Sequence, residues 1–230
     1  MSRQDSDLQG KLIVITGGLG ILGHAITQAA HDMGAITALI DRVEPRNADH
    51  GATLVVSGID LADPASAKAA FKQIADKLGP VHALMNVAGA FAWNKVADGG
   101  MDAWTDMYRA NVLSAVGASI AVLEHMPSGG AIINVAAAAT TRAAAGMGAY
   151  TAAKSGVLRL TESLADELKP RGIRVNSVSP TILDTPRNRD DMPDADPSKW
   201  LQPSDLAKTM LWLASSESNA LTGANLLAGQ

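Results

Sequence analysis

Short apolar runs alternate with amphipathic stretches along most of the chain. Residues 11–16 form the first such run, and the apolar side chains of residues 21–33 recur at helical spacing. The same alternation continues to the end of the sequence. It predicts strands at 11–16, 36–40, 53–57, 81–86, 130–135, 173–178 and 221–227, and helices at 21–33, 64–77, 101–125, 149–168 and 203–214.

Strands that alternate with helices pair in parallel, because each crossover helix returns the chain to the same end of the sheet. Several predicted strands are continuously apolar, which is typical of strands buried on both faces. The pattern predicts an α/β fold, a doubly wound seven-stranded parallel sheet in a three-layer α/β/α sandwich. No linker or repeat divides residues 1–230, so we expect a single domain. The Pro- and Asp-rich stretch 179–202 is predicted to be a loop, and we expect its residues 181–202 to cover the substrate.

Composition excludes several classes of function. The chain is 47% apolar and 18% charged, with a net charge of −4 and no basic block, so nucleic acid is not an expected partner. There is no cysteine, which excludes disulfides, thiolate metal sites and a cysteine nucleophile. The five histidines form no HxxH or HExxH pair, so no metal is expected. The first seven residues are polar and acidic and no apolar run reaches about 18 residues, so we expect a cytoplasmic protein without membrane contact.

A glycine-rich turn, TGGLGILG over residues 16–23, joins the first predicted strand to the first helix. Glycines permit a tight turn and a close approach of the backbone to a pyrophosphate, whose negative charge is favoured at a helix N-terminus. The turn could also serve only close packing of strand and helix. The candidate phosphate-binding residues are Gly17, Gly18, Leu19, Gly20, Ile21 and Leu22.

An acidic residue, Asp41, follows the second predicted strand at close to the ~20-residue spacing expected for a carboxylate on the adenosine ribose. Such a carboxylate accepts hydrogen bonds from the ribose hydroxyls and repels a 2′-phosphate. Together with the glycine turn it predicts a Rossmann-type dinucleotide site that prefers NAD(H). Arg42 comes directly afterwards and weakens this preference unless it is only a solvated surface residue, so NADP(H) is not excluded.

Tyr150 and Lys154 lie four residues apart at the start of the predicted helix 149–168, and therefore on one face of it. A free phenol has a pKa of about 10. We expect the nearby ammonium and a positively charged nicotinamide ring to lower the pKa of Tyr150. The pair could then protonate a carbonyl or imine during reduction and accept the proton in the reverse direction.

Several motifs occur in an order and spacing that resemble the short-chain dehydrogenase/reductase family over essentially the whole chain. They are the turn 16–23, the NVAG stretch 86–89, Asn111, the Tyr150/Lys154 pair, and Ser179-Pro180 with Thr185. The resemblance implies an oxidoreductase that transfers hydride between a nicotinamide cofactor and a small carbonyl, alcohol or conjugated imine. Tyr150 would be its general acid and base.

The same resemblance assigns further residues. It implies that Asp60 lies at the adenine, that Asn86 and Gly89 line the cofactor, and that Thr185 lies near the nicotinamide carboxamide. It implies that Asn111 supports a water relay to Lys154. The remaining cofactor contacts that we expect are Leu61, Ala88 and Pro180, together with Tyr150 and Lys154. As local structure alone, Asn86 could merely end a strand and Asn111 could be a satisfied buried amide.

One position departs from the family pattern. The family's catalytic serine falls at Ala137, and residues 135–141 contain no serine. The loss of one such donor typically costs about 10²–10³ in rate. Three interpretations follow: a hydroxyl of Thr140 or Thr141 substitutes, the substrate needs less polarisation, or the protein binds its cofactor without catalysis.

The segment 183–200 is similar to the corresponding loop of the quinonoid dihydropteridine reductases within this family, which also carry alanine at the serine position. This resemblance implies that NADH reduces a conjugated imine, and it places Phe91 beside the substrate with Ala137 and Thr140. Core packing is the alternative for Phe91. Asn111 and the strand end 175–180 resemble ordinary bacterial reductases instead, so the similarity could mark a subgroup rather than a substrate.

Family members associate through helices that correspond to 101–125 and 149–168. The resemblance therefore implies a homodimer or homotetramer. The apolar side chains of these two stretches could equally belong to the core of one chain.

Overall fold

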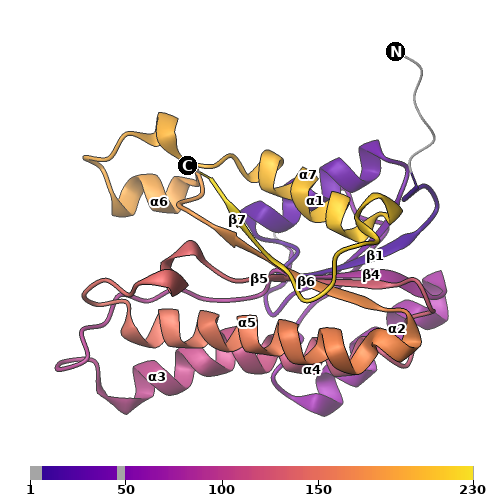
Figure 1. Ribbon diagram of the computed structural model, residues 1–230, viewed down its shortest axis with the longest axis horizontal. Coiled ribbons are helices and arrows are strands. Elements are labelled where there is room, and N and C mark those ends of the chain that lie inside the picture. Colours follow the sequence, from indigo (N-terminus) through magenta and orange to yellow (C-terminus); the bar gives the residue numbers. More distant parts are fainter. Residues whose placement is uncertain (1–6, 46–49, 230) are drawn as a thin grey trace.

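The computed structural model describes residues 7–45 and 50–229 and shows one sheet with helices on both faces (Figure 1). Every strand pair is parallel, and the order is β3-β2-β1-β4-β5-β6-β7. The strands are β1 (Leu12–Thr16), β2 (Ile36–Ile40), β3 (Leu54–Val56), β4 (Val81–Asn86), β5 (Ala131–Val135), β6 (Arg174–Pro180) and β7 (Asn225–Ala228). The larger helices are α1 (Ile21–Asp32), α2 (Pro64–Leu78), α3 (Gly100–Tyr108), α4 (Ser114–Val122), α5 (Gly148–Leu168) and α7 (Pro203–Ala214). The predicted Rossmann-type, seven-stranded α/β fold is confirmed.

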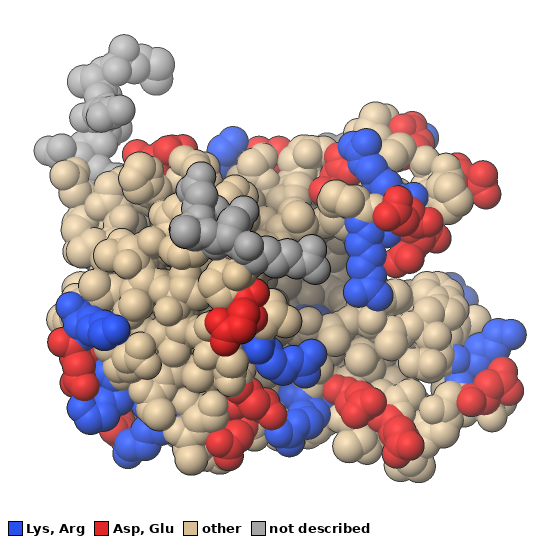
Figure 2. Space-filling view, turned by 180° about the vertical axis from the view of Figure 1, so that it is seen from behind, with Lys and Arg blue, Asp and Glu red and all other residues tan. Residues whose placement is uncertain are grey.

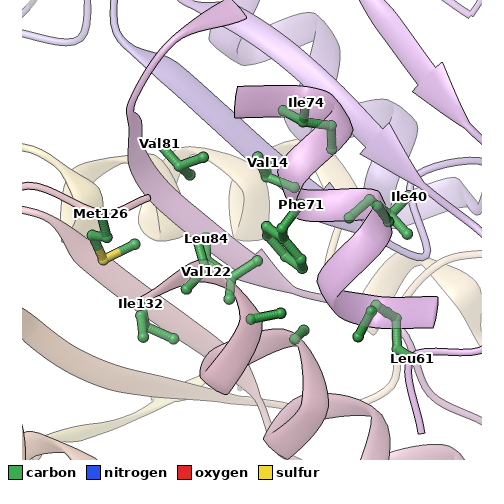
Figure 3. Close-up of a cluster of buried hydrophobic side chains, with 14 of the residues drawn as sticks. Val14, Ile40, Leu61, Phe71, Ile74, Val81, Leu84, Val122, Met126 and Ile132 are labelled. Carbon is green, nitrogen blue, oxygen red and sulfur yellow. The ribbon is translucent and has the colours of Figure 1, made fainter. Parts of the chain in front are cut away.

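Alternate residues of the strands enter two separate cores. In β1, Leu12 and Val14 pack in the layer of α2, α4 and α5, whereas Ile13 and Ile15 pack in the layer of α1 and α7. Figure 3 shows the first of these cores, which has the fully buried ring of Phe71 at its centre. Because both faces of β1 are covered, its sequence is a continuous apolar run rather than an alternating one.

The stretch 179–202 is not the irregular loop that the sequence predicts. It contains α6 (Pro186–Asp191) and a 3-10 turn, η4 (Pro197–Lys199). The Thr185 side chain caps α6 by accepting a hydrogen bond from the backbone of Asn188 (3.2 Å), and Asp196 caps η4 in the same way. A capping side chain followed by proline is a signal for the start of a helix. Pro186 and Pro197 therefore begin two short helices instead of lying in an irregular loop.

The continuous helix predicted over 101–125 is also corrected. The chain forms α3, then a π-helical turn η1 (Arg109–Leu113), then α4, which ends at Val122. A π turn inserts one residue into the helical repeat. Apolar spacing does not resolve so small a shift. The last strand is also shorter than predicted, at 225–228 rather than 221–227.

The longest helix, α5, has 21 residues, and charged side chains occur along it. Among the described residues, no helix is both long enough and apolar enough to cross a membrane. Of the polar opening segment, only Asp7 lies within the described residues.

Candidate active site

The residues selected from the sequence gather at the carboxyl edge of the sheet. β1 lies between β2 and β4 in the sheet. The chain leaves β1 toward one face of the sheet, where α1 packs, and leaves β4 toward the other face, where α4 packs. Doubly wound proteins have their ligand-binding crevice between two such strands. The glycine turn follows β1, Asp41 follows β2, residues 86–89 end β4 and Ala137 follows β5. Figure 2 shows the molecule hollowed, at the right, between the segment that carries α6 and the part beneath it.

The glycine turn is shaped by close backbone contacts. Gly17 has φ +63°, and a Cβ there would lie 2.9 Å from the backbone of Ala88. A Cβ at Gly23 would lie 2.6 Å from the carbonyl oxygens of Gly17 and Gly18. At Gly20, the N-cap of α1, a Cβ would meet only the Gly17 oxygen, at 3.3 Å. The N–H groups of the first turn of a helix have no intrahelical acceptor. This end of α1 could therefore hold a pyrophosphate.

Asp41 lies against the glycine turn. One of its carboxylate oxygens accepts the N–H of Leu19 (3.0 Å), and the other accepts the N–H of Val43 (3.2 Å). These bonds fix the carboxylate beside the turn. It could therefore meet the ribose of a dinucleotide whose pyrophosphate lies on α1.

Asp60 forms an ion pair that the sequence analysis did not predict. Its Oδ2 accepts a hydrogen bond from Arg109 Nη2 (2.5 Å), and its Oδ1 accepts the N–H of Ala62 (2.9 Å). The Arg109 guanidinium is the main reason that the pKa of Asp60 lies below its usual value, and Arg42 contributes. Gly117 lets α4 approach this turn, because a Cβ there would lie 2.0 Å from the Leu61 carbonyl oxygen. No sequence signal connects Arg109 to a carboxylate 49 positions away.

Asn111 lies in the π turn η1, and its side chain bonds to the backbone of its own helix and of the segment that follows β4. Its Nδ2 donates to the carbonyls of Met107 (2.9 Å) and Ala90 (3.0 Å), and its Oδ1 accepts the Ala90 N–H (3.3 Å). A Cβ at Gly89 would lie 2.6 Å from Asn111 Oδ1 and 3.3 Å from Lys154 Nζ. The glycine therefore brings the π turn and α5 together at one point.

Tyr150 and Lys154 lie on the first turns of α5 with the predicted spacing. The Lys154 ammonium is buried and donates to the Val135 carbonyl (2.8 Å), which ties α5 to the end of β5. Burial lowers the pKa of Lys154 to about 8 and raises the pKa of Tyr150 to about 12. The expected lowering of the phenol's pKa is therefore wrong for the protein alone, because burial favours the neutral phenol.

Ala137 is buried at the end of β5, where the hydroxyl of a serine would otherwise stand. The two nearby threonines do not replace it, because Thr140 Oγ1 donates to the Ala137 carbonyl (2.8 Å) and Thr141 Oγ1 donates to the Ala138 carbonyl (3.0 Å). A hydroxyl has one proton to donate. In this conformation neither threonine offers a donor to a substrate.

Phe91 lies at the site rather than in the core. Its ring is 36% exposed and meets the Tyr150 ring edge-on, with 4.9 Å between the ring centroids. The core-packing alternative for this residue is therefore wrong.

A buried polar network that includes Asn134, which the sequence analysis missed, lies beneath the site. Asn86 Nδ2 donates to Ser119 Oγ (3.1 Å) and to Asn134 Oδ1 (2.8 Å), and Asn134 Nδ2 donates to Thr161 Oγ1 (2.9 Å). Asn86 Oδ1 is buried without a partner among the described residues. The Asn86 side chain thus joins β4 to β5 and α4 rather than lying open in the crevice. An asparagine within a predicted apolar strand was the available signal for Asn134.

The two ends of the segment 181–202 are tied together. Leu183 and Leu201 form a parallel bridge. Asp184 accepts two hydrogen bonds from Arg189 (2.6 and 2.8 Å) and one from Gln202 (3.0 Å), and these donors hold the pKa of Asp184 at about 2. A cavity of about 400 Å³ lies beside Asp184 and Arg189. Pro180 and Thr185, the two predicted cofactor contacts of this region, lie at its first end.

No group of three or more histidine, cysteine, aspartate or glutamate side chains that could hold a metal occurs in the part of the chain that the structure describes.

Comparisons with known proteins identify relatives of this arrangement. A family profile described as short chain dehydrogenase matches residues 11–196. The 3-oxoacyl-(acyl-carrier-protein) reductase FabG of Vibrio cholerae is 32% identical over 234 residues, covering 96% of both chains. D-threitol dehydrogenase of Mycolicibacterium smegmatis is 31% identical over 97% of this chain and 93% of its own. The solved structure of a short chain dehydrogenase from Burkholderia cenocepacia in complex with NADP has a TM-score of 0.85 at 26% identity, covering 97% of this chain and 98% of its own.

The chain belongs to the short-chain dehydrogenase/reductase family. It is an NAD(P)-dependent oxidoreductase of that type with a Rossmann-type fold. The relatives' names refer to unrelated substrates, so the substrate has to be argued from this chain's own crevice.

Burial of the Lys154 ammonium predicts how the free energy of unfolding depends on pH. An unfolded lysine keeps its proton up to its ordinary pKa of 10.5, whereas folded Lys154 loses it near 8. Between these values the unfolded chain binds more protons, so wild type gains stability relative to Lys154→Met as the pH rises, by at most about 1.4 kcal/mol per pH unit. Below pH 8 the difference between the two is constant. Denaturant unfolding from pH 7 to 10.5 measures it.

Lys68→Met is the control, because Lys68 is exposed in an ion pair with Glu124. Any change common to both variants reports the loss of a lysine charge in general, and the change found only in Lys154→Met reports burial. An equal pH dependence in both variants would contradict a shifted, buried ammonium.

Proposed function

We propose that this protein reduces a small conjugated carbonyl or imine with NADH, with Tyr150 as the proton donor. The observation that carries the proposal is the meeting of Lys154 and Asn111 at Gly89, close to the glycine turn, with Tyr150 one turn before Lys154 on α5. When bound there, NADH would supply the hydride that the carbon of the substrate's double bond receives. Tyr150 gives its phenolic proton to the oxygen or nitrogen that gains the electron pair, which yields an alcohol or an amine.

The protonation states fit this direction of reaction. With a pKa raised to about 12, the Tyr150 phenol carries its proton at neutral pH. Lys154, whose ammonium persists below about pH 8, stabilises the phenolate that proton donation leaves behind. We assign Asn111 to the path by which solvent returns a proton to Lys154.

The backbone cradle supports a dinucleotide along the carboxyl edge of the sheet. The N–H groups of Ile21 and Leu22 would bind the pyrophosphate, within the turn that Gly17, Gly18, Leu19 and Gly20 shape. Asp41 would bind the adenosine ribose, and Asp60 with Arg42 and Leu61 the adenine. The backbone of Asn86, together with Ala88 and Gly89, would line the middle of the cofactor at the end of β4. Pro180 and Thr185 would lie at its nicotinamide end.

We assign NAD(H) as the preferred cofactor because the Asp41 carboxylate would face the 2′-position of the ribose. A relative's structure holds NADP, so the family alone does not decide the matter. Asp41→Ser should raise the ratio of kcat/KM with NADPH to kcat/KM with NADH by about tenfold or more, since about 1.4 kcal/mol of removed repulsion corresponds to tenfold. Steady-state kinetics with both cofactors measures the ratio. An unchanged ratio would place the determinant elsewhere, and Asp76→Ser, on the exposed side of α2, is the control.

The missing hydroxyl at Ala137 supports this class of substrate. Without a second donor, the crevice polarises a carbonyl weakly. A conjugated acceptor that is already electrophilic needs less polarisation, which distinguishes this site from that of a simple ketone reductase. A quinonoid dihydropterin is one member of this class and rests on the resemblance of segment 183–200 alone. None of the three relatives described above bears that name.

Tyr150→Phe tests the proton donor. The variant keeps the ring and its contact with Phe91. We therefore expect NADH to bind as in wild type while hydride transfer falls by about 10²–10⁴-fold, the usual contribution of a general acid. Stopped-flow oxidation of NADH is measured against a panel of quinones, α-diketones and quinonoid dihydropterin. If Phe at this position leaves the rate unchanged, the proposal fails.

Ala137→Ser tests the missing donor. The new hydroxyl should raise kcat/KM for simple, unactivated ketones by up to about 10²–10³-fold. It should change the rate with already activated substrates much less. Ala138→Ser, one residue farther along, is the matched control. A variant that gains on neither substrate class would mean that another group already polarises the carbonyl.

For assembly, we propose a homodimer or homotetramer through α4 and α5, as the family resemblance implies. The large apolar side chain of Ile120 on α4 is 63% exposed, which a second copy of the chain would cover.

A further inference from the structure

Two aromatic rings continue outward from Tyr150 along the segment that follows β4. Phe91 meets Tyr150 edge-on, and Trp93 meets Phe91 edge-on with 6.0 Å between the ring centroids. Trp93 is 60% exposed, although a tryptophan indole is one of the largest apolar surfaces that a side chain can bury. The exposed rings adjoin the proposed proton donor.

Trp93 is held in place by the opposite segment. A Cβ at Gly146 would lie 2.2 Å from Trp93 Nε1, so the indole fits directly against the glycine. The backbone N–H of Asn94 donates to the Gly146 carbonyl (2.8 Å), which joins the two segments. A ligand that bound the exposed part of the indole would therefore lose little conformational entropy in ordering the Trp93 side chain.

Apart from the exposed Arg142, the neighbouring segment 136–145 offers a substrate few hydrogen-bond donors. Residues 136–139 and 143–145 are all alanine. The hydroxyls of Thr140 and Thr141 donate to backbone carbonyls instead. A polyol would leave hydroxyl groups unpaired against such a wall, which costs binding energy. A flat apolar ring would not.

We propose that Phe91 and Trp93 form an aromatic shelf that binds a flat, unsaturated, fused-ring substrate, and that Trp93 determines this preference. This inference rests on the proposed function, since it names the class of conjugated carbonyl or imine that the crevice receives. It predicts that puckered saturated rings and sugar-like polyols bind poorly. The chemistry that recognises the ligand is contact between its ring face and the two aromatic side chains.

Binding without turnover tests the shelf directly. The NADH-loaded protein is titrated by calorimetry with 2-naphthol and with 2-decalol, which share a fused two-ring skeleton and one hydroxyl and differ in flatness. We expect 2-naphthol to bind more tightly, by up to roughly tenfold for a ring contact of ordinary strength. Trp93→Leu should abolish this preference, and Trp93→Phe should restore most of it. Trp212→Phe, on α7 at the other face of the sheet, should leave it unchanged.

The outcomes separate the shelf from the reaction. Equal affinity for the two ligands, or an equal loss of affinity for both in Trp93→Leu, overturns the shelf and leaves the proposed reduction standing. Tighter binding of 2-naphthol that depends on Trp93, combined with full activity of Tyr150→Phe, supports the shelf and overturns the proposed proton donor. Because Trp93→Phe keeps an aromatic ring at the same place, it also shows whether a loss in Trp93→Leu reflects the ring rather than misfolding.

Discussion

A short chain of buried hydrogen bonds holds α5 against the sheet, and the geometry of the site depends on it. Asn86 of β4 reaches Asn134 of β5, and Asn134 reaches Thr161 of α5. Leaving a buried amide without a hydrogen-bond partner costs free energy, so these bonds fix the position of α5 along the strand direction. The Lys154 ammonium on the Val135 carbonyl fixes the same helix one turn from Tyr150. Because Lys154 and Thr161 lie about two turns apart on α5, these two contacts together prevent the helix from sliding along the sheet.

The electrostatics of the site follow from the same burial. Removal from water disfavours the charged form of any group, so it raises the pKa of a phenol and lowers the pKa of an amine. Tyr150 and Lys154 are both driven toward neutrality, and Lys154 keeps its charge at neutral pH by a margin of about one unit. A fold optimised only for stability would not bury an ammonium against a lone carbonyl. Its retention is typical of a functional group that reduces stability.

The sequence predicted the sheet, its parallel pairing and the positions of the larger helices because strong apolar periodicity decides these features. The sequence also revealed the glycine turn and the Tyr150/Lys154 pair through their spacing, whereas Asn111 was assigned only by the family resemblance. It could not predict the ion pair between Asp60 and Arg109, whose members come from segments that only the tertiary fold joins. Nor could it predict the π turn, because one extra residue hardly alters an apolar pattern.

Two local features were also beyond pattern reading. The Thr140 hydroxyl cannot replace a serine because it donates its proton to the Ala137 carbonyl. No sequence motif predicts that hydrogen bond. The helix starts at Pro186 and Pro197 were readable in principle, because each proline follows a capping side chain. Proline breaks a helix in its interior but begins one at its first position, so the position of a proline decides its effect.

The tied ends of segment 181–202 have a consequence for how such a protein diversifies. The bridge between Leu183 and Leu201 holds the two ends of the segment next to each other, so the chain enters and leaves the segment at nearly the same point. Insertions, deletions or a replaced sequence within residues 192–199 would leave Thr185, the register of β6 and the start of α7 in place. The tip of this segment can therefore change in sequence and length during evolution, while the sheet and the glycine turn stay the same.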